Sequence, residues 1–366
     1  MNFGEDLEIE ILLRLPLKSL MRFKCVQTSW NNLIKTPYFV NRKTNLSSIS
    51  PNRNQNRSLL IIEGSKVKLL PCVSYNEKPI LVNSLFPNHL NRIDSYGSCN
   101  GVFCLKGIYT DTKSHGQLIM WNPTTNEVHH IPHAPSPRTD FSYGFGTVAS
   151  DFKVIRLTSY HKGMTTFLCP FAEVYSLNTK SWTIIRCPCM DVTNYRPSRY
   201  INEYRHPSSK YNALVNGVFY WITSSNLDIF PTADILCFNF CNHKFRKLES
   251  PMSDVIRTSY CHDLIEVEGS LGYVMQSNTS SYNVWFEIWV IDQNKWSKKY
   301  AIETSTLSLR RFGNDAAEIF GGKAGELLKS YDHHGKKLRQ FQTGIPKMDY
   351  FKIYEYVPSI TLLSIK

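Results

Sequence analysis

The sequence has no apolar run that approaches the roughly 20 residues of a membrane-spanning helix. The nearest stretch, residues 284–291, is only eight residues long and contains Glu287. The first 20 residues also lack the basic start and uninterrupted apolar core of a secretory signal, because they carry several carboxylates. We therefore expect no membrane association and a location in the cytoplasm, the nucleus or both.

Structural disulfides and metal centres are not expected either. The chain has ten cysteines, but thiols stay reduced in those compartments. A structural zinc site needs four Cys or His ligands, whereas the two short clusters supply fewer: Cys187 with Cys189, and Cys237, Cys241 with His243. We expect these side chains to belong to the protein core and predict no metal.

Motifs for catalysis or cofactor binding are scarce. The sequence contains no Walker loop, Gly-x-Ser-x-Gly elbow or His-Glu-x-x-His. Residues 144–149 match a dinucleotide-binding string by letters, but residues 152–157 read as a strand, not as the helix whose N-terminus would bind a pyrophosphate. We predict no cofactor, no catalytic residue and no enzymatic activity.

Basic residues outnumber acidic ones, 42 to 30, which gives a net charge of +12. Such a balance suits either a nucleic acid or an acidic protein surface. The basic clusters are short and scattered, which favours solvated turns over a continuous phosphate-binding track. We therefore expect no nucleic acid and favour a protein partner with an acidic surface.

Two compositional regimes divide the chain. Leu7, Ile11 and Leu15 recur at every fourth position, and a second helical pattern follows Pro16, a residue that separates helices. Further on, short Val, Ile, Phe, Tyr and Trp runs alternate with turn residues, which is typical of β-strands. The predicted parts are a small all-α segment of about three helices, a Ser/Asn-rich linker and an all-β domain, at residues 1–43, 44–58 and 59–366.

The β region carries a loose internal repeat. Its polar turn markers, spaced 56, 61, 53 and 40 residues apart, are Asn122, Asn178, Asn239, Asp292 and Asp332. A period near 50 with four short strands is typical of a kelch-like β-propeller blade. The length predicts about six blades, with residues 354–363 sharing a blade with 59–62. An open sandwich or several stacked sheets is the alternative.

The motifs of both regions resemble one plant family. Residues 7–30, with Leu-Pro-x-Lys-Ser-Leu and Arg-Phe-Lys-Cys-Val elements, resemble the F-box in its plant form. Five later segments are similar to the F-box-associated interaction domain, found also in S-locus F-box proteins: residues 98–105, 121–124, 143–146, 151–157 and 216–221.

The resemblance implies a substrate receptor of a Skp–cullin–F-box ubiquitin ligase. The F-box would dock on a Skp-type adaptor, and through it on a cullin, while the β domain captures a target protein for ubiquitination and proteasomal degradation. The chain would then act by proximity, not by forming bonds. The candidate adaptor-binding residues are Leu7, Ile11, Leu15, Pro16, Leu20, Phe23, Val26 and Trp30, with packing among the helices as the alternative for each.

Two other functions remain open from the residues alone. A β-propeller with this charge could bind a glycan or RNA outside any ubiquitin ligase. For a receptor, target contacts are expected on long loops at one face of the propeller, and the candidate loops are residues 132–142, 158–171, 190–210 and 222–233.

Overall fold

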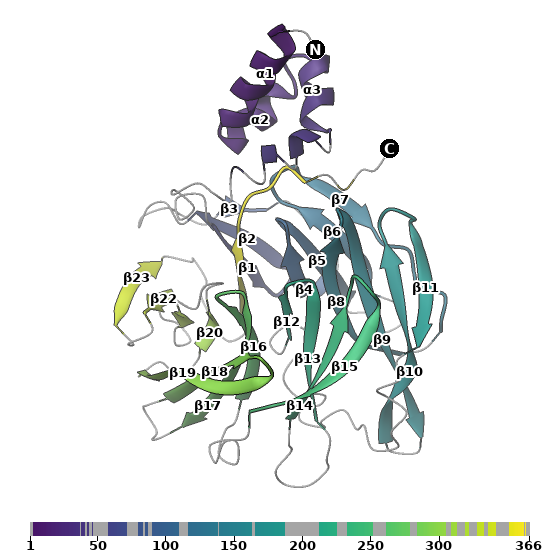
Figure 1. Ribbon diagram of the computed structural model, residues 1–366, viewed down its shortest axis with the longest axis vertical. Helices are drawn as coiled ribbons and strands as arrows, with labels where there is room; N and C mark the ends of the chain where they lie inside the picture. The colour runs from purple at the N-terminus through teal and green to yellow at the C-terminus, as the bar shows by residue number, and fades with distance from the viewer. Residues whose placement is uncertain are drawn as a thin grey trace.

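The computed structural model of the chain places short helices on a ring of antiparallel β-sheets (Figure 1). The helices are α1 (Phe3–Arg14), α2 (Leu17–Phe23) and α3 (Thr28–Ile34). None of the described helices is long and apolar enough to cross a membrane. The structure describes residues 3–36, 38–40, 42–43, 46, 58–71, 80–82, 85–86, 90–109, 116–137, 139–162, 165–186, 212–224, 233–251, 261–278, 284–304, 309–312, 319–321, 328–332, 336–341, 351–361 and 363.

The described strands form six four-stranded antiparallel sheets, each with its strands in sequence order except for the first. Sheet 1 is β24 (Phe351–Tyr356), β1 (Ser58–Glu63), β2 (Lys66–Pro71) and β3 (Ile80–Leu81). Sheet 2 is β4 (Leu90–Cys99), β5 (Val102–Tyr109), β6 (Leu118–Asn122) and β7 (Glu127–His130). Sheet 3 is β8 (Thr139–Val148), β9 (Asp151–Lys162), β10 (Thr165–Ser176) and β11 (Ser181–Arg186).

The remaining sheets continue around the ring in the same way. Sheet 4 is β12 (Asn212–Val215), β13 (Val218–Ser224), β14 (Ala233–Asn239) and β15 (Lys244–Glu249). Sheet 5 is β16 (Cys261–Val267), β17 (Ser270–Asn278), β18 (Val284–Asp292) and β19 (Lys295–Thr304). Sheet 6 is β20 (Leu309–Phe312), β21 (Ile319–Gly321), β22 (Leu328–Tyr331) and β23 (Lys337–Phe341).

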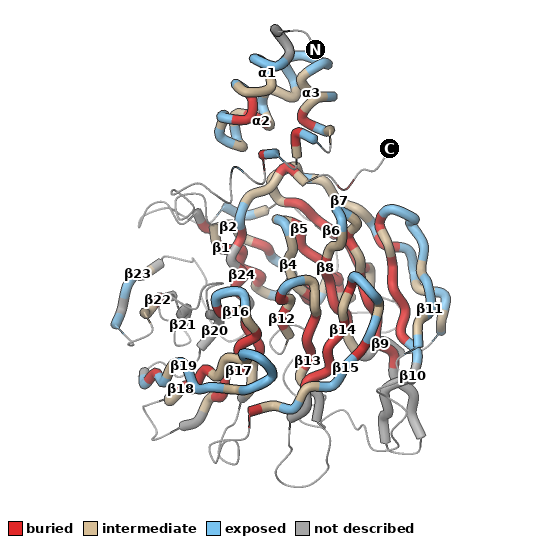
Figure 2. Tube along the Cα trace, viewed as in Figure 1, coloured by how far each residue is buried: buried red, intermediate tan, exposed pale blue. Residues whose placement is uncertain are grey.

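The core of the ring lies between adjacent sheets, where buried aromatic and aliphatic side chains from both neighbours meet. In sheet 2, β5 and β6 are buried over nearly their whole length (Figure 2). Because each sheet covers the apolar face of the next, no sheet needs a second layer of its own. Sheets 1 to 5 supply nearly all of this described core, and the smaller sheet 6 adds Tyr331 against sheet 5.

The two ends of the β region close the ring. β24 pairs antiparallel with β1, from Ser58 opposite Tyr356 to Glu63 opposite Phe351. The predicted sharing of one sheet by both ends is therefore confirmed, although residues beyond Tyr356 leave the sheet. The predicted class, a helical N-terminal segment followed by an all-β propeller, is confirmed as well, and the sandwich alternative is wrong.

Hairpin turns explain why the repeat is visible in the sequence. The turn between the first two strands passes through pairs of left-handed residues in four sheets: Asn100-Gly101, Ala149-Ser150, Asn216-Gly217 and Glu268-Gly269. Such pairs match the twist of two-residue β-hairpins. After the third strand, the Asn122 and Asn239 side chains each accept a backbone N–H from the turn that follows.

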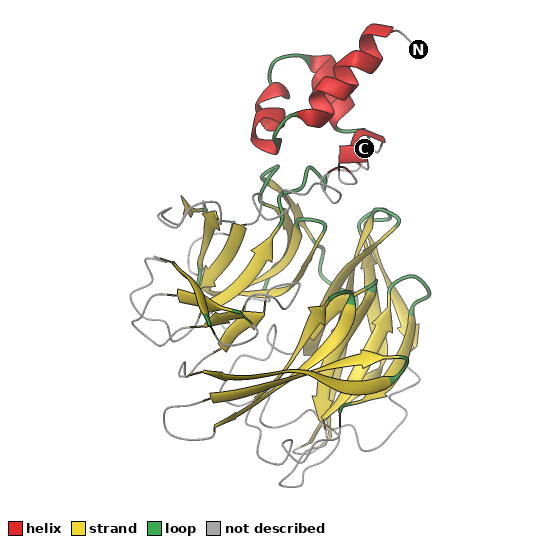
Figure 3. Cartoon of the chain, turned by 60° about the vertical axis from the view of Figure 1, so that its left-hand side comes forward, coloured by secondary structure: helices red, strands yellow, loops and turns green. Residues whose placement is uncertain are grey.

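The direction of the strands sorts all connections onto two rims of the ring. Since strands alternate, the first and third hairpins of sheets 2 to 6 lie at the same rim as the start of β1 and the end of β24. The helices join the ring at this rim (Figures 1 and 3). We call it the helix-side rim, and the opposite one the far rim.

Candidate functional site

The helices α1 to α3 and residues 38–43, together called the helical unit, enclose a small apolar core. Its fully buried side chains are Leu12, Leu13, Leu20, Ile34, Phe39 and Ile360. The first five come from the unit itself, whereas Ile360 comes from the segment that follows β24. About 40 residues bury too little surface to be stable without further support, and the C-terminal segment supplies part of that support.

A second apolar set on the helical unit points to solvent. The exposed fraction is 59% for Leu7, 53% for Ile11 and 64% for Val26. Leu7 and Ile11 are one helical turn apart on α1 and so share a face. Val26 lies in the connection between α2 and α3. These three predicted adaptor contacts are therefore not covered by the chain itself.

The remaining predicted contacts occupy intermediate positions. Pro16 is exposed, and Leu15, Phe23 and Trp30 are half-buried against the core of the helical unit. The rings of Phe23 and Trp30 lie 5.4 Å apart and tilted by 52°. The Trp30 indole N–H also donates a hydrogen bond of 3.1 Å to the Glu8 carboxylate, so this side chain of α3 contacts both α1 and α2.

Leu20 has a different role from the one predicted. Its side chain is fully buried in the core of the helical unit, because α2 is a seven-residue helix that turns this position toward α1 and α3. The structure thus agrees with the alternative interpretation, in which Leu20 packs among the helices. We therefore leave Leu20 out of the adaptor-facing set.

Lys43, which the sequence interpretation missed, caps the end of α1. Its ammonium donates hydrogen bonds of 2.7 Å to the carbonyl oxygens of Leu13 and Leu15. Those carbonyls have no partner within the helix, and a cation there also interacts favourably with the helix dipole. Burial lowers the pKa of Lys43. The only sequence signal is a lysine at the end of an apolar helical segment, which is too common to identify it.

The helical unit also faces the ring through Lys24, the residue that follows α2. Burial lowers the pKa of Lys24, and the nearby Glu127 carboxylate, on β7, opposes that shift. A charge on the helical unit is thus placed against a charge on sheet 2.

The predicted target-binding loops differ in how the structure places them. Residues 158–171 are not a loop, because β9 and β10 extend through this region as a long hairpin. Residues 131–137 are held against sheet 3, where Ser136 contacts the buried ion pair of Arg156 and Glu173. The loop 190–210 and residues 225–232 lie outside the described residues. All these connections leave and re-enter the sheets at the far rim.

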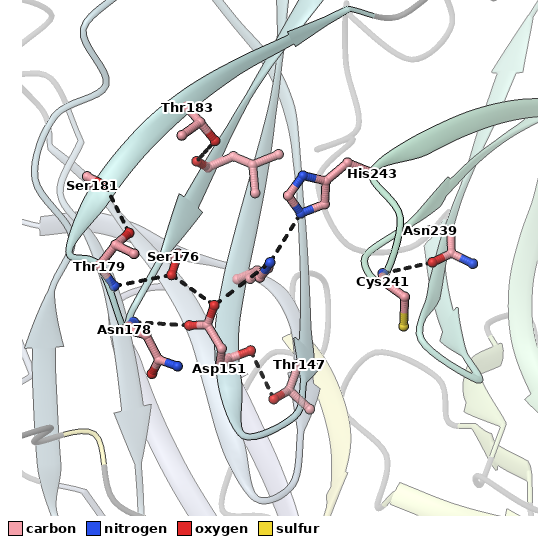
Figure 4. Close-up of polar contacts among 12 residues, drawn as sticks. Thr147, Asp151, Ser176, Asn178, Thr179, Ser181, Thr183, Asn239, Cys241 and His243 are labelled. Atoms are coloured by element: carbon pink, nitrogen blue, oxygen red, sulfur yellow. Dashed lines mark hydrogen bonds and ion pairs between the residues drawn. The ribbon is translucent and has the colours of Figure 1, made fainter.

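A polar cluster joins sheets 3 and 4 at the helix-side rim (Figure 4). Asp151 accepts hydrogen bonds from the Ser176 hydroxyl and the Asn178 backbone N–H, at 2.8 and 3.0 Å. Lys153 Nζ lies 3.1 Å from His243 Nε2. Burial and the Lys153 charge lower the pKa of His243, which Asp151 opposes. These polar side chains stabilise turns or connect sheet 3 to sheet 4.

The candidate metal ligands are not brought together. Cys237 is buried and its thiol contacts the carbonyl oxygen of Ile235, while Cys241 is exposed on the following turn. Among the described residues no group of three or more His, Cys, Asp or Glu side chains could hold a metal ion. Cys187 and Cys189 lie outside those residues.

Comparison with known families identifies the ring. Residues 59–327 match the model of the F-box associated beta propeller domain. The chain belongs to this F-box associated β-propeller family. The match begins after the helical unit and runs from β1 to β21, so that it leaves out β22, β23 and β24.

Individual relatives are F-box proteins of Arabidopsis thaliana. F-box/kelch-repeat protein At3g23880 is 26% identical over 82% of this chain and 79% of its own length. F-box protein At3g07870 is 24% identical over 83% and 73%, respectively. At3g16210, whose name also contains the words F-box protein, is 29% identical over 68% of this chain, a match that spans only 60% of its own length.

Proposed function

We propose that this F-box associated β-propeller protein is the substrate-recognition subunit of a Skp–cullin–F-box ubiquitin ligase. The helical unit docks on a Skp-type adaptor and the propeller captures the protein to be ubiquitinated. The chain itself is non-catalytic and raises the effective concentration of a target lysine beside a charged ubiquitin-conjugating enzyme.

The observation that carries the proposal is the solvent-facing apolar set Leu7, Ile11 and Val26. Each exposes more than half of its side chain, although the same helices also build a closed core. Aliphatic side chains exposed as a group on a small helical unit are typical of a protein-binding surface. Pro16, Leu15, Phe23 and Trp30 complete the adaptor-facing set.

The distribution of the connections supports the second half of the proposal. The described turns at the helix-side rim are short, whereas the connection between β11 and β12, residues 187–211, leaves and re-enters the sheets at the far rim. A receptor that holds its adaptor at one rim gains room for a target at the other. We place target capture at the far rim, and the net charge of +12 favours an acidic target surface.

The test is capture of a purified Skp-type adaptor by the full-length protein. We expect Leu7→Asp with Ile11→Asp to abolish capture, because two carboxylates would enter an apolar interface. Ile184→Asp on β11 is the matched control, since Ile184 is 62% exposed but lies on the propeller. Undiminished capture by the double variant would refute the proposed adaptor site.

A further inference from the structure

The segment after β24, yellow in Figure 1, crosses the helix-side rim of sheet 2 beneath the helical unit. We call residues 357–363 the C-terminal strap. At its start Tyr356 contacts the Thr124 hydroxyl, and at its end Leu363 is buried between sheets 2 and 3. Between these two anchors, Ile360 inserts into the core of the helical unit.

Sheet 2 binds the backbone of the strap through a dedicated set of hydrogen bonds. The Asn122 amide donates to the carbonyl oxygens of Ser359 and Thr361, at 3.0 and 2.7 Å. The Ser359 N–H donates to the Thr124 hydroxyl at 3.1 Å. The Leu363 N–H donates to the Glu127 carboxylate at 2.9 Å. Four backbone groups of the strap are thus satisfied by side chains of β6, of β7 and of the turn between them.

The fit is close enough to require glycine at one position. Gly101 has a φ of +76°, and a Cβ there would lie 2.5 Å from Ser359 Cβ and 3.0 Å from the Val357 carbonyl oxygen. Gly217 and Gly269 occupy equivalent turns in sheets 4 and 5, where an added Cβ would meet nothing within 4 Å. The close approach is therefore specific to the turn that the strap crosses.

Asn122 likewise differs from its counterpart in sheet 4. Both Asn122 and Asn239 end the third strand and accept turn N–H groups through Oδ1. Only Asn122 is fully buried, and its amide nitrogen is used for the strap. In the segments Asn122-Pro-Thr-Thr and Asn100-Gly101, the residues placed against the strap are Asn122, Thr124 and Gly101.

We propose that the C-terminal strap is the coupling element that holds the helical unit in one orientation on the propeller. Ile360 and Asn122 are positioning residues. Ile360 joins the strap to the core of the helical unit, and Asn122 joins it to sheet 2. The consequence for ligase activity rests on the proposed function, because a fixed orientation sets the span from the adaptor to a target at the far rim. The coupling of the helical unit to the propeller does not rest on the proposed function.

The test is the distribution of distances between labels on the two parts of the full-length protein. Encoded spin-label amino acids replace Arg14 on α1 and Lys295 on β19, both exposed, so the native cysteines stay unmodified. The strap variants are Asn122→Asp and Ile360→Asp. Asn122→Asp keeps the Oδ1 acceptor but turns a carboxylate oxygen toward two carbonyls. The matched controls are Asn239→Asp and Val357→Asp, the latter at a strap residue that is 38% exposed.

We expect one narrow distribution for the parent and both controls, and a distribution about twofold wider or more for both strap variants. Unchanged distributions in both strap variants would overturn the coupling role. If Ile360→Asp unfolds the helices, Asn122→Asp decides, because among the described residues the side-chain hydrogen bonds of Asn122 go to the strap and to its own turn. Adaptor capture by the parent separates the two proposals: a parent that captures no adaptor refutes the proposed function, while the distances in Asn122→Asp still test the strap.

Discussion

The indole N–H of Trp182 donates a hydrogen bond of 2.8 Å to the carbonyl oxygen of Pro132. Trp182 is the second residue of the outermost strand of sheet 3, and Pro132 follows the outermost strand of sheet 2. Trp296 repeats the arrangement in sheet 5, where it donates to the Glu249 carbonyl of sheet 4 at 2.8 Å. These indoles connect neighbouring sheets at their outermost strands, where they pack against the edge of the buried core.

Replacing either indole with phenylalanine keeps the ring but removes the hydrogen bond between sheets. We expect Trp182→Phe and Trp296→Phe each to lower the free energy of unfolding by about 1 kcal/mol. Urea denaturation followed by circular dichroism measures the change. Unaltered stability in both variants would mean that the apolar contact of the indole, and not its N–H, joins the sheets.

A second prediction concerns the glycine under the strap. Gly101→Ala and Gly269→Ala share the cost of placing alanine at φ +76° and +78°, respectively, which is about 1 kcal/mol each. Only Gly101→Ala adds a clash with the strap. We expect a larger loss of thermal stability for Gly101→Ala than for Gly269→Ala. Equal losses would show that the strap does not press on this turn.

The sequence was sufficient to predict local features that repeat. Turn pairs such as Asn216-Gly217 and alternating aromatic strands depend on the conformational preferences of a few neighbouring residues. They led to the all-β ring and its closure by the two chain ends, while the helical segment was predicted from apolar residues at every fourth position. Two markers lie beyond their strands: β10 ends at Ser176, whose hydroxyl accepts the Thr179 N–H, and β22 ends at Tyr331, one residue before Asp332.

Contacts between distant segments could not be predicted in the same way. Ile360 is one aliphatic residue in a Ser/Thr-rich tail, and nothing near it in the sequence shows that it enters a core about 350 residues earlier in the chain. Leu20 is a second example, because the sequence of a short helix does not show which of its apolar side chains face the core and which face solvent. The prediction of a loop at residues 158–171 was wrong because β9 and β10 are longer than ordinary strands and extend into this region.

A third prediction concerns the ion pair inside sheet 3. Arg156 and Glu173 are cross-strand neighbours on β9 and β10 and are almost completely buried. Both also bind the backbone of Ser136, at 3.1 Å each. Removing one partner leaves a buried charge, so we expect Glu173→Leu to lower the free energy of unfolding by about 3 to 5 kcal/mol.

The double variant separates the pair from its surroundings. Arg156→Met with Glu173→Leu replaces both charges by apolar side chains, so its loss is expected to be smaller than the sum of the single losses. Chemical denaturation of the two single variants and the double variant completes the cycle. Strictly additive losses would show that the two side chains act independently.

The last prediction is a dependence of stability on pH that comes from His262. This side chain lies on β16, and its Nδ1 is buried with no hydrogen-bond partner among the described residues. Burial lowers the pKa of His262 from 6.5 to about 4. The folded state therefore binds fewer protons than the unfolded state between these values, and its stability falls as the pH decreases from 6.5 toward 4. A shift of this size corresponds to about 3 kcal/mol.

His262→Phe removes the titrating group and keeps an aromatic ring beside Tyr273, whose ring lies 5.7 Å away in the parent. Between pH 6.5 and 4 we expect this variant to lose less stability than the parent, by up to that amount. His133→Gln, at an exposed histidine, is the control and should follow the parent. Urea midpoints at several pH values measure the difference, and parallel curves for the parent and His262→Phe would show that His262 does not drive the acid sensitivity.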